Sequence, residues 1–162
     1  MDTPAEPKIS VILPAKNEAE GLRRTLPGLR GLLRDAEVIV VDDGSTDDTA
    51  AVAREHGAVV LSSPYSMGNG AAIKRGARAA SGEILVFMDG DGQHDPRLVH
   101  QLLGKIEAGV EMAVGARDAS GQASAGRGAA NALYNRLASW MTGHKVADLT
   151  SGFRAVRAER FR

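Results

Sequence analysis

Residues 84–96 read ILVFMDGDGQHDP, and this stretch decides the fold. Five apolar residues run without a break and then stop at Asp89-Gly90-Asp91. Such a run is typical of a buried parallel strand whose polar residues lie at its carboxyl end. In open α/β sheets, ligands bind in the crevice outside the carboxyl ends of the strands. The sequence therefore predicts a ligand site where this strand ends.

The two carboxylates of this stretch favour a bound cation. Asp89 and Asp91 are separated by one glycine, so both can face one hard cation with little steric obstruction. Adjacent carboxylates repel each other unless a cation lies between them, and a simple turn has no need of the second charge. Gln93 adds a neutral oxygen two residues further on. Asp95, which precedes Pro96, is explained instead as the N-cap of a helix with a first-turn proline.

Composition excludes several classes of function. The chain has 162 residues, and its 20 basic and 20 acidic side chains give no electrostatic reason to expect a nucleic-acid partner. It contains no cysteine, which rules out disulfides and thiolate metal sites. No apolar run approaches the roughly 20 residues that span a bilayer, and residues 1–7 lack the apolar core of a signal peptide. The histidines have no metal-ligand spacing and are expected at the surface or in support of other side chains: His56, His94, His100 and His144.

Strand and helix patterns alternate along the chain. Strands are predicted over 8–13, 37–41, 58–61, 83–88 and 111–115, and helices over 19–34, 45–55, 71–80, 96–108 and 129–142. This alternation predicts an α/β fold, a three-layer α/β/α sandwich with a mostly parallel central sheet. The first helix should kink or break at Pro27 and Gly28. Residues 1–7 are expected to be a disordered tail, and 119–128 a flexible loop or lid.

The loops after the first, second and fourth strands should share one edge of the sheet. They would bring Glu18, Asp43, Asp89 and Asp91 around one crevice. Carboxylates that hold a hard cation normally handle phosphate. Asp42-Asp43 has two readings, a helix-entry turn or hydrogen bonding to a base or ribose, and the pattern does not separate them. The side chains suited to neutralise a diphosphate are Lys16, Lys74, Arg75 and Arg117.

Three other phosphate-handling classes are disfavoured: P-loop NTPases, dinucleotide-dependent dehydrogenases and nucleotidyltransferases. The chain has no P-loop motif, and no G-x-G-x-x-G follows its first strand. A nucleotidyltransferase with a similar α/β fold would usually carry a glycine-rich basic loop after its first strand. Residues 14–18 of this chain read PAKNE and contain no glycine, which argues against that class.

Six motifs, in this order and at these spacings, resemble family 2 glycosyltransferases with the A-type nucleotide-diphospho-sugar fold. The resemblance is closest to the branch of dolichol- or polyprenyl-phosphate mannose or glucose synthases. It implies a catalytic domain over residues 8–162 with a Rossmann-like nucleotide-binding core, truncated at its C-terminal end. The motifs are SVILPAKNEAEGL (10–22), VIVVDDGSTDDT (38–49), MGNGAAIKRG (67–76), FMDGDGQHDP (87–96), VGAR (114–117) and DLTSGFR (148–154).

The resemblance also implies roles for individual positions. Asp89, Asp91 and Gln93 would hold Mg²⁺ or Mn²⁺ on the donor diphosphate. Arg117 would approach a phosphate of the donor or acceptor, and Asp148 would lie near the sugar or acceptor. Whether Asp148 is a general base or only positions the acceptor stays open, because an anionic phosphate acceptor needs no base. The remaining donor-binding positions would be Pro14, Lys16, Glu18, Val41, Asp43, Lys74 and Gly90.

The implied activity is an inverting, metal-dependent transfer of a hexose from a GDP- or UDP-sugar. The expected acceptor is a polyprenyl or dolichyl phosphate; the alternatives are a glycan or small-molecule hydroxyl, or a module that binds nucleotide sugars without turnover. Lys16 departs from the family, where many relatives carry an aromatic residue. The basic and membrane-associated segments that relatives carry beyond the GFR motif are missing from this chain. We expect a cytoplasmic protein or one at the cytoplasmic membrane face, with any membrane contact made by residues outside this chain.

Overall fold

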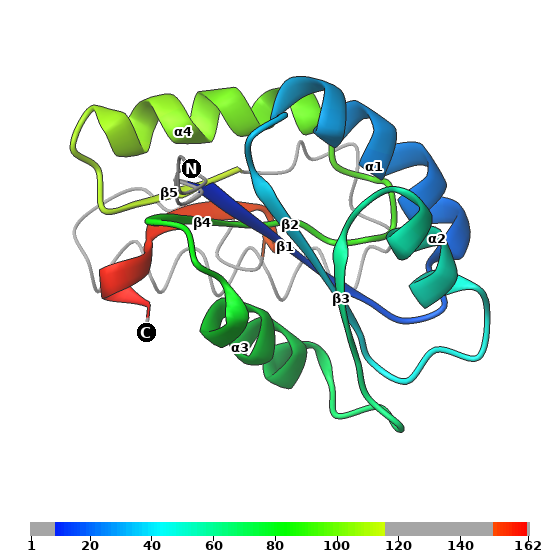
Figure 1. Ribbon diagram of the computed structural model, residues 1–162. Helices are drawn as coiled ribbons and strands as arrows, with labels where there is room; N and C mark the ends of the chain where they lie inside the picture. The colour runs from blue at the N-terminus through cyan, green and yellow to red at the C-terminus, as the bar shows by residue number, and fades with distance from the viewer. Residues whose placement is uncertain (1–8, 116–150, 162) are drawn as a thin grey trace, which may run out of the picture.

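The computed structural model describes residues 9–115 and 151–161 (Figure 1). Within them, six strands form one sheet in the order β3-β2-β1-β4-β6-β5. β1 pairs in parallel with β2 and β4, and β2 pairs in parallel with β3. β6 runs antiparallel between β4 and β5. The strands are β1 (Ile9–Ala15), β2 (Glu37–Asp42), β3 (Val59–Ser62), β4 (Ile84–Phe87), β5 (Met112–Val114) and β6 (Arg154–Arg157).

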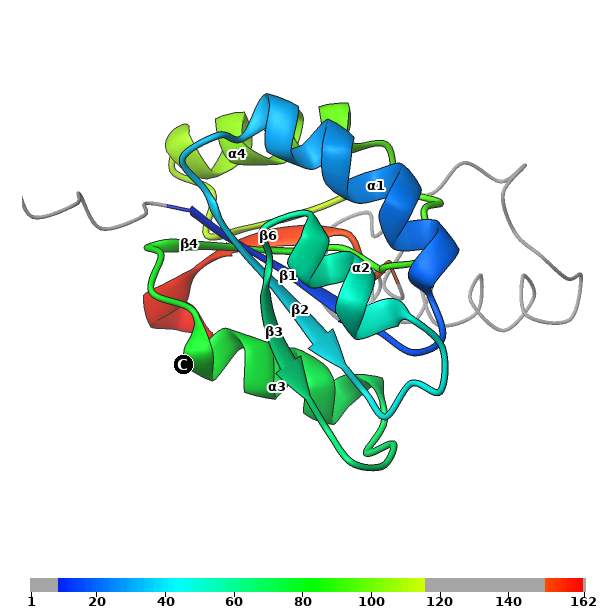
Figure 2. The same ribbon diagram turned by 45° about the vertical axis from the view of Figure 1, so that its right-hand side comes forward.

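Helices cover both faces of this sheet (Figures 1 and 2). α1 (Ala19–Leu32), α2 (Thr49–Glu55) and α4 (Val99–Glu107) pack on one face, and α3 (Asn69–Ala79) packs on the other. The short 3-10 helices η1 (Pro96–Leu98) and η3 (Ala158–Arg160) precede α4 and follow β6. The predicted three-layer sandwich with a mostly parallel sheet is therefore confirmed. None of the helices in the described residues is long and apolar enough to cross a membrane.

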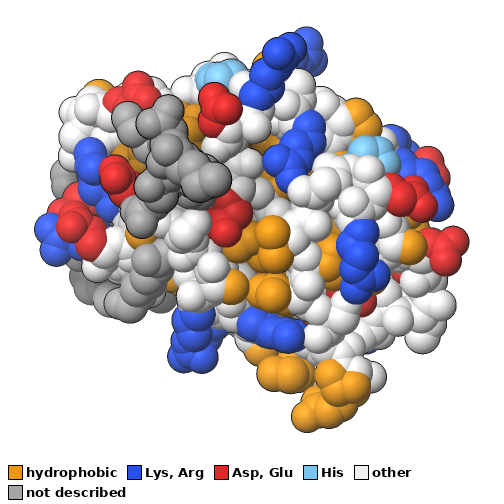
Figure 3. Space-filling model, viewed as in Figure 1, with side chains coloured by type: hydrophobic (Ala, Val, Ile, Leu, Met, Phe, Trp, Pro, Cys, Tyr) orange, Lys and Arg blue, Asp and Glu red, His pale blue; other side chains and the backbone are white. Residues whose placement is uncertain are grey.

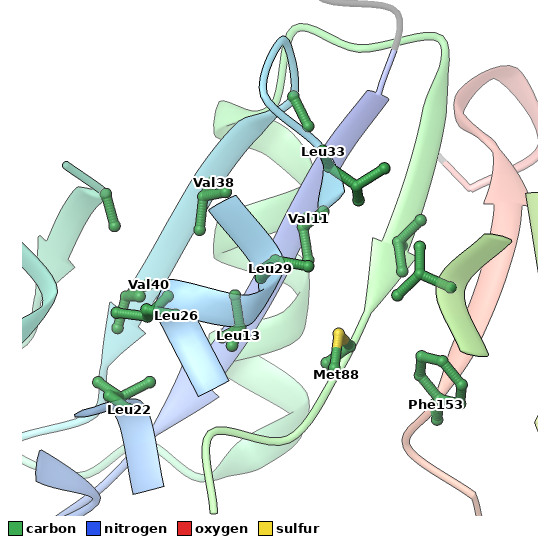
Figure 4. Packing of buried hydrophobic residues seen from close by; sticks show 14 of the residues in the cluster. Val11, Leu13, Leu22, Leu26, Leu29, Leu33, Val38, Val40, Met88 and Phe153 are labelled. Carbon is green, nitrogen blue, oxygen red and sulfur yellow. The ribbon is translucent and has the colours of Figure 1, made fainter. Parts of the chain in front are cut away.

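The period-two pattern of the strands divides the buried side chains between two cores. In β1, Val11 and Leu13 face the helices α1 and α4, whereas Ile12 faces α3. Figure 4 shows the larger of the two cores, in which the leucines of α1 lie over β1 and β2. The leucines at helical spacing, confirmed as the buried face of α1, are Leu22, Leu26 and Leu29, with Leu33 following the helix end.

Of the two alternatives predicted at Pro27 and Gly28, a kink or a break of the first helix, the break is wrong. α1 continues through Pro27 to Leu32. Proline removes one backbone donor, and the carbonyl left without that donor belongs to Arg23, four residues earlier. Arg23 and Pro27 both lie on the exposed face of α1, so water can hydrogen-bond the carbonyl. The free-energy cost of the missing backbone hydrogen bond is therefore low on this face of α1.

β6 was not predicted, and it brings a polar loop to the edge of the sheet where β4 ends. Arg154 pairs with Phe87, the last residue of β4. The preceding residues, Ser151, Gly152 and Phe153, therefore lie beside the Asp-Gly-Asp turn that follows β4. The predicted cap at Asp95 is confirmed, because its carboxylate accepts a hydrogen bond from the Arg97 backbone N–H at 2.9 Å.

Two glycine-to-alanine substitutions test the packing of α3 against the sheet. A Cβ at Gly76 would overlap Ile12 Cγ2, which lies in the fully buried part of β1. Gly76→Ala should therefore lower the free energy of unfolding by about 1–3 kcal/mol. Gly104→Ala is the matched control on α4, where a Cβ meets nothing within 4 Å. It should raise the free energy of unfolding by about 0.5–1 kcal/mol, because alanine favours helix.

Urea unfolding measures both changes. A Gly76→Ala protein as stable as the Gly104→Ala protein would contradict this contact between α3 and β1.

Candidate active site

A cleft of about 340 Å³ opens at the carboxyl ends of β1, β2 and β4. It lies at the edge of the sheet that the sequence predicts for the ligand. Its walls come from the β1–α1, β2–α2, β3–α3 and β4–η1 loops together with the first turn of α3. The lining residues are Pro14, Ala15, Lys16, Glu18, Asp43, Ser66, Gly68, Asn69, Ala72, Asp89, Gly90 and Asp91.

Hydrogen bonds between two loops fix the β1 side of the cleft. Asn17 has a φ of 55°, and its backbone N–H donates to Ser45 Oγ at 2.9 Å. The Thr46 N–H returns a hydrogen bond to Asn17 Oδ1 at 2.8 Å, and the Glu18 N–H donates to Thr49 Oγ1 at 2.9 Å. The β1–α1 loop is thus held against the β2–α2 loop, and Glu18 is held at the rim of the cleft.

Asp47 joins the same two loops through its carboxylate. One oxygen accepts the Ala19 N–H at 3.2 Å, across the loops, and the other accepts the Thr49 N–H at 2.9 Å and the Thr49 hydroxyl. Burial opposes the charged form of Asp47, but the hydrogen bonds from Thr49 and Ala19 outweigh it and lower the pKa of this carboxyl. The predicted helix over 45–55 starts only at Thr49, because residues 45–48 are used in these contacts.

Asp43 fastens the β3–α3 loop to the end of β2. Its carboxylate accepts the Met67 N–H at 2.7 Å, the Gly68 N–H at 3.0 Å and the Ser66 hydroxyl at 2.7 Å. The backbone hydrogen bond from Met67 is the main reason that the pKa of Asp43 lies below its usual value. Asp42 accepts the Ser45 N–H at 2.9 Å. These contacts support the turn reading of the acidic pair, and a role in binding the base or ribose stays a prediction.

Glu18, Asp89 and Asp91 line the cleft together with Asp43, so four carboxylates share it. The pKa of Glu18 is raised, first by burial and then by the charges of Asp91, Asp47 and Asp89, with Arg24 offsetting a part. A cation placed among neighbouring carboxylates relieves the repulsion between their negative charges. The electrostatics of the cleft therefore favour a divalent ion beside Asp89 and Asp91.

The side chains present fit such an ion when it arrives with a phosphate ligand. Among the described residues, no three His, Cys, Asp or Glu side chains form a metal-binding cluster. Mg²⁺ is usually held by one or two carboxylates together with substrate phosphates and water, rather than by a complete protein cage. Asp89 and Asp91 supply that number of carboxylates. The donor set of the cleft is thus suited to a metal-bound diphosphate.

Gln93 does not line this cleft. Its side chain is exposed beside a neighbouring cavity of about 280 Å³ that Arg24, Thr25 and His94 also line. Its backbone N–H donates to Asp91 Oδ1 at 2.9 Å, which orients that carboxylate. Its predicted role as a metal ligand stays a prediction.

The other predicted site residues fall into three groups. Pro14, Lys16 and Gly90 line the cleft as expected. The side chain of Val41 is buried in the core beneath α3, and Lys74 is exposed on α3, over which Figure 3 shows basic side chains. Arg117 and Asp148 lie outside the described residues, as does the 119–128 loop.

The N-terminus of α3 is also part of the cleft, and it was not predicted from the sequence. Ser66, Gly68 and Asn69 line it, and the helix begins at Asn69. Backbone N–H groups at a helix N-terminus, together with the helix dipole, favour an anion. The sequence Gly68-Asn69-Gly70 is the local pattern that could have indicated this site. A tight turn into a helix explains the same pattern without any ligand. With Lys16, this N-terminus supplies positive potential opposite the carboxylates.

Comparison with known proteins gives a family. A family model described as Glycosyl transferase family 2 matches residues 10–162. The undecaprenyl-phosphate 4-deoxy-4-formamido-L-arabinose transferase of Enterobacter sp. (strain 638) is 35% identical over 162 residues, covering 93% of this chain and 49% of that protein. The dolichol-phosphate mannosyltransferase of Pyrococcus furiosus is 34% identical over 173 residues, covering 94% of this chain and 47% of that protein. The chain spans about half the length of the curated relatives it matches.

A solved structure adds a bound donor. Glucosyl-3-phosphoglycerate synthase from Mycobacterium tuberculosis, in complex with Mn²⁺, UDP-glucose and phosphoglyceric acid, superposes with a TM-score of 0.76 at 30% identity. The match covers 94% of this chain and 57% of that one.

The crowding of carboxylates leads to a stability prediction. Glu18→Gln should raise the melting temperature of the metal-free protein at pH 7 by roughly one to two degrees. Because the pKa of Glu18 is raised in the folded protein, its charged form destabilises the fold at neutral pH. That penalty fades as the pH falls through the raised folded-state pKa, so the difference between variant and parent should disappear in acidic buffer.

Glu55→Gln, at an exposed position on α2 outside the cleft, is the control and should leave the melting temperature nearly unchanged. Thermal unfolding over a pH series measures both variants. Equal shifts in the two proteins would argue against charge repulsion in the cleft.

Proposed function

The chain belongs to glycosyltransferase family 2, and we propose that it transfers a hexose from a UDP- or GDP-sugar to a phosphate-bearing acceptor, with Mn²⁺ or Mg²⁺ as the cofactor. The observation that carries the proposal is the cleft, which Asp89 and Asp91 line together with Lys16 and the N-terminus of α3. This arrangement combines the ligands of a hard cation with donors for an anion.

The chain's own residues would divide the donor between them. Asp89 and Asp91 would hold the cation, which when bound neutralises charge on the departing nucleoside diphosphate. Lys16 and the N–H groups at the start of α3 would contact the diphosphate oxygens. Asp43 would keep the β3–α3 loop, and hence that helix N-terminus, at the correct distance. The acceptor oxygen would then form its bond to the anomeric carbon from the face opposite the breaking bond to the diphosphate, which inverts the configuration.

A relative of known structure indicates which nucleotide the donor carries. The solved relative was determined with UDP-glucose and Mn²⁺. A UDP-sugar is therefore the first donor to test, with a GDP-sugar as the alternative.

The acceptor is proposed to be a polyprenyl or dolichyl phosphate. Two curated relatives, each at least 34% identical over most of this chain, are named for undecaprenyl phosphate and dolichol phosphate. A phosphate monoester is already anionic near neutral pH and needs no general base, so Asp148 would then position the acceptor rather than deprotonate it. Such an acceptor would place the protein at the cytoplasmic face of a membrane.

A small phosphorylated acceptor is the second candidate. The relative of known structure was determined with phosphoglyceric acid at a comparable identity of 30%.

Removal of one carboxylate tests the metal site. Asp91→Ala should weaken Mn²⁺-dependent UDP binding and lower donor turnover on the order of 100-fold, because several kcal/mol of charge stabilisation are lost. Asp95→Ala is the matched control in the same loop, since Asp95 caps the following helix and does not line the cleft. Calorimetry with Mn²⁺ and UDP compares the two proteins. If Asp91→Ala bound the pair as tightly as the parent, the metal assignment would be wrong.

Radiolabelled UDP- and GDP-hexoses, incubated separately with polyprenyl phosphate and 3-phosphoglycerate, identify the acceptor. We expect label in the organic phase with polyprenyl phosphate, accompanied by release of nucleoside diphosphate. Label that stays with phosphoglycerate would select the small acceptor instead. Release of pyrophosphate would indicate a nucleotidyltransferase, and binding without any turnover would indicate a module that only binds nucleotide sugars.

A further inference from the structure

We propose that His94 is a positioning residue that holds the carboxylate of Asp89 in its metal-binding orientation. This inference rests on the proposed function, because it takes Asp89 as a ligand of the metal. His94 Nε2 lies 3.3 Å from Asp89 Oδ2. The side chain of His94 is 11% exposed, whereas that of Asp89 is 34% exposed. The histidine thus contacts the carboxylate from the protein side and leaves it open to the cleft.

The backbone of Gly152 bounds the same carboxylate. A Cβ at this position would lie 2.5 Å from Asp89 Oδ2 and 2.7 Å from Oδ1, closer than real Cβ contacts come. Residue 152 therefore has to be glycine while Asp89 keeps this orientation. Gly152 and His94 together restrict rotation of the carboxylate about its Cβ–Cγ bond.

His94 is in turn fixed by an aromatic ring. Its imidazole stacks on Phe153, with 5.2 Å between the ring centroids and 23° between the planes. Phe153 is 2% exposed and belongs to the same core as Met88, the residue before Asp89 (Figure 4). The histidine is thus supported by a buried side chain of the core.

Phe153 itself is held by the end of β5. The Gly115 N–H donates to the Phe153 carbonyl at 2.8 Å, and the Ser151 hydroxyl donates to the Gly115 carbonyl at 2.5 Å. The Phe153 N–H donates to Ser151 Oγ at 3.2 Å. A Cβ at Gly115 would overlap the ring of Phe153, so the backbone lies directly on that ring. A continuous set of contacts therefore runs from β5 through Phe153 and His94 to Asp89.

Positioning by His94 needs its N–H, whereas a purely packing role needs only its ring. His94→Phe keeps the stack on Phe153 and removes the hydrogen bond to Asp89. His94→Gln places an amide N–H where Nε2 lies and removes the ring. The two variants therefore separate the two roles.

Mn²⁺ affinity in the presence of UDP, measured by electron paramagnetic resonance titration of free Mn²⁺, gives a readout that does not depend on turnover. We expect His94→Phe to bind Mn²⁺ about tenfold more weakly, the usual consequence of removing a group that orients a metal ligand, and His94→Gln to recover most of this loss. His100→Phe, the same substitution at an exposed histidine of α4, should bind as the parent does.

Gly152→Ala provides a second test that leaves His94 unchanged. Its Cβ would displace the Asp89 carboxylate, so Mn²⁺ should again bind several-fold more weakly, at a melting temperature that shows a folded protein. If His94→Phe and Gly152→Ala both bound Mn²⁺ as the parent does, the positioning role would be overturned while the proposed function stood. Failure of the parent protein to bind Mn²⁺ with UDP would overturn both.

Discussion

The parallel pairing of β1 with β4 is the constraint on which the site depends. The pairing continues past the end of β4, where the Met88 N–H donates to the Ile12 carbonyl at 3.1 Å and the Gly90 N–H donates to the Pro14 carbonyl at 3.3 Å. These bonds bring the Asp-Gly-Asp turn against the end of β1. Because β2 pairs with the other side of β1, Asp43 arrives at the same edge. Carboxylates from turns far apart in the sequence thus share one cleft as a direct consequence of strand order.

Close backbone contacts set how tightly this turn is enclosed. α1 approaches it at Gly21, where a Cβ would overlap the carbonyl oxygen of Gly90. Gly152 approaches from the other side and touches the carboxylate of Asp89. With backbone on two sides, the carboxylates are turned toward the cleft rather than into the protein. Rotation therefore does not relieve the repulsion among them, which together with the larger effect of burial raises the pKa of Glu18.

Features that depend on local sequence could be predicted from it, and those that depend on distant contacts could not. The apolar run before Asp89 predicted β4, and Asp95 before Pro96 predicted its cap, since both signals lie within a few residues. β6 was missed because Arg154-Ala155-Val156-Arg157 is short, and both of its ends are charged. The hydrogen bonds of Asp43 to residues 66–68 were missed because more than 20 positions separate the partners. His94 was expected either at the surface or in support of other side chains, and nothing in the sequence identified Asp89 or Phe153 as its neighbours.

The same distinction applies to the proposed donor side of the cleft. It is built from β1, β2, β4 and the start of α3, and its strands are brought together by the strand order of the sheet. Gly115, which follows β5, and Ser151, which precedes β6, are joined by a hydrogen bond next to Phe153. The end of β5 and the start of β6 therefore meet at one place, close to Asp89. The contacts that bound Asp89 on this side are therefore made by residues distant from it in the sequence, so local patterns could not predict them.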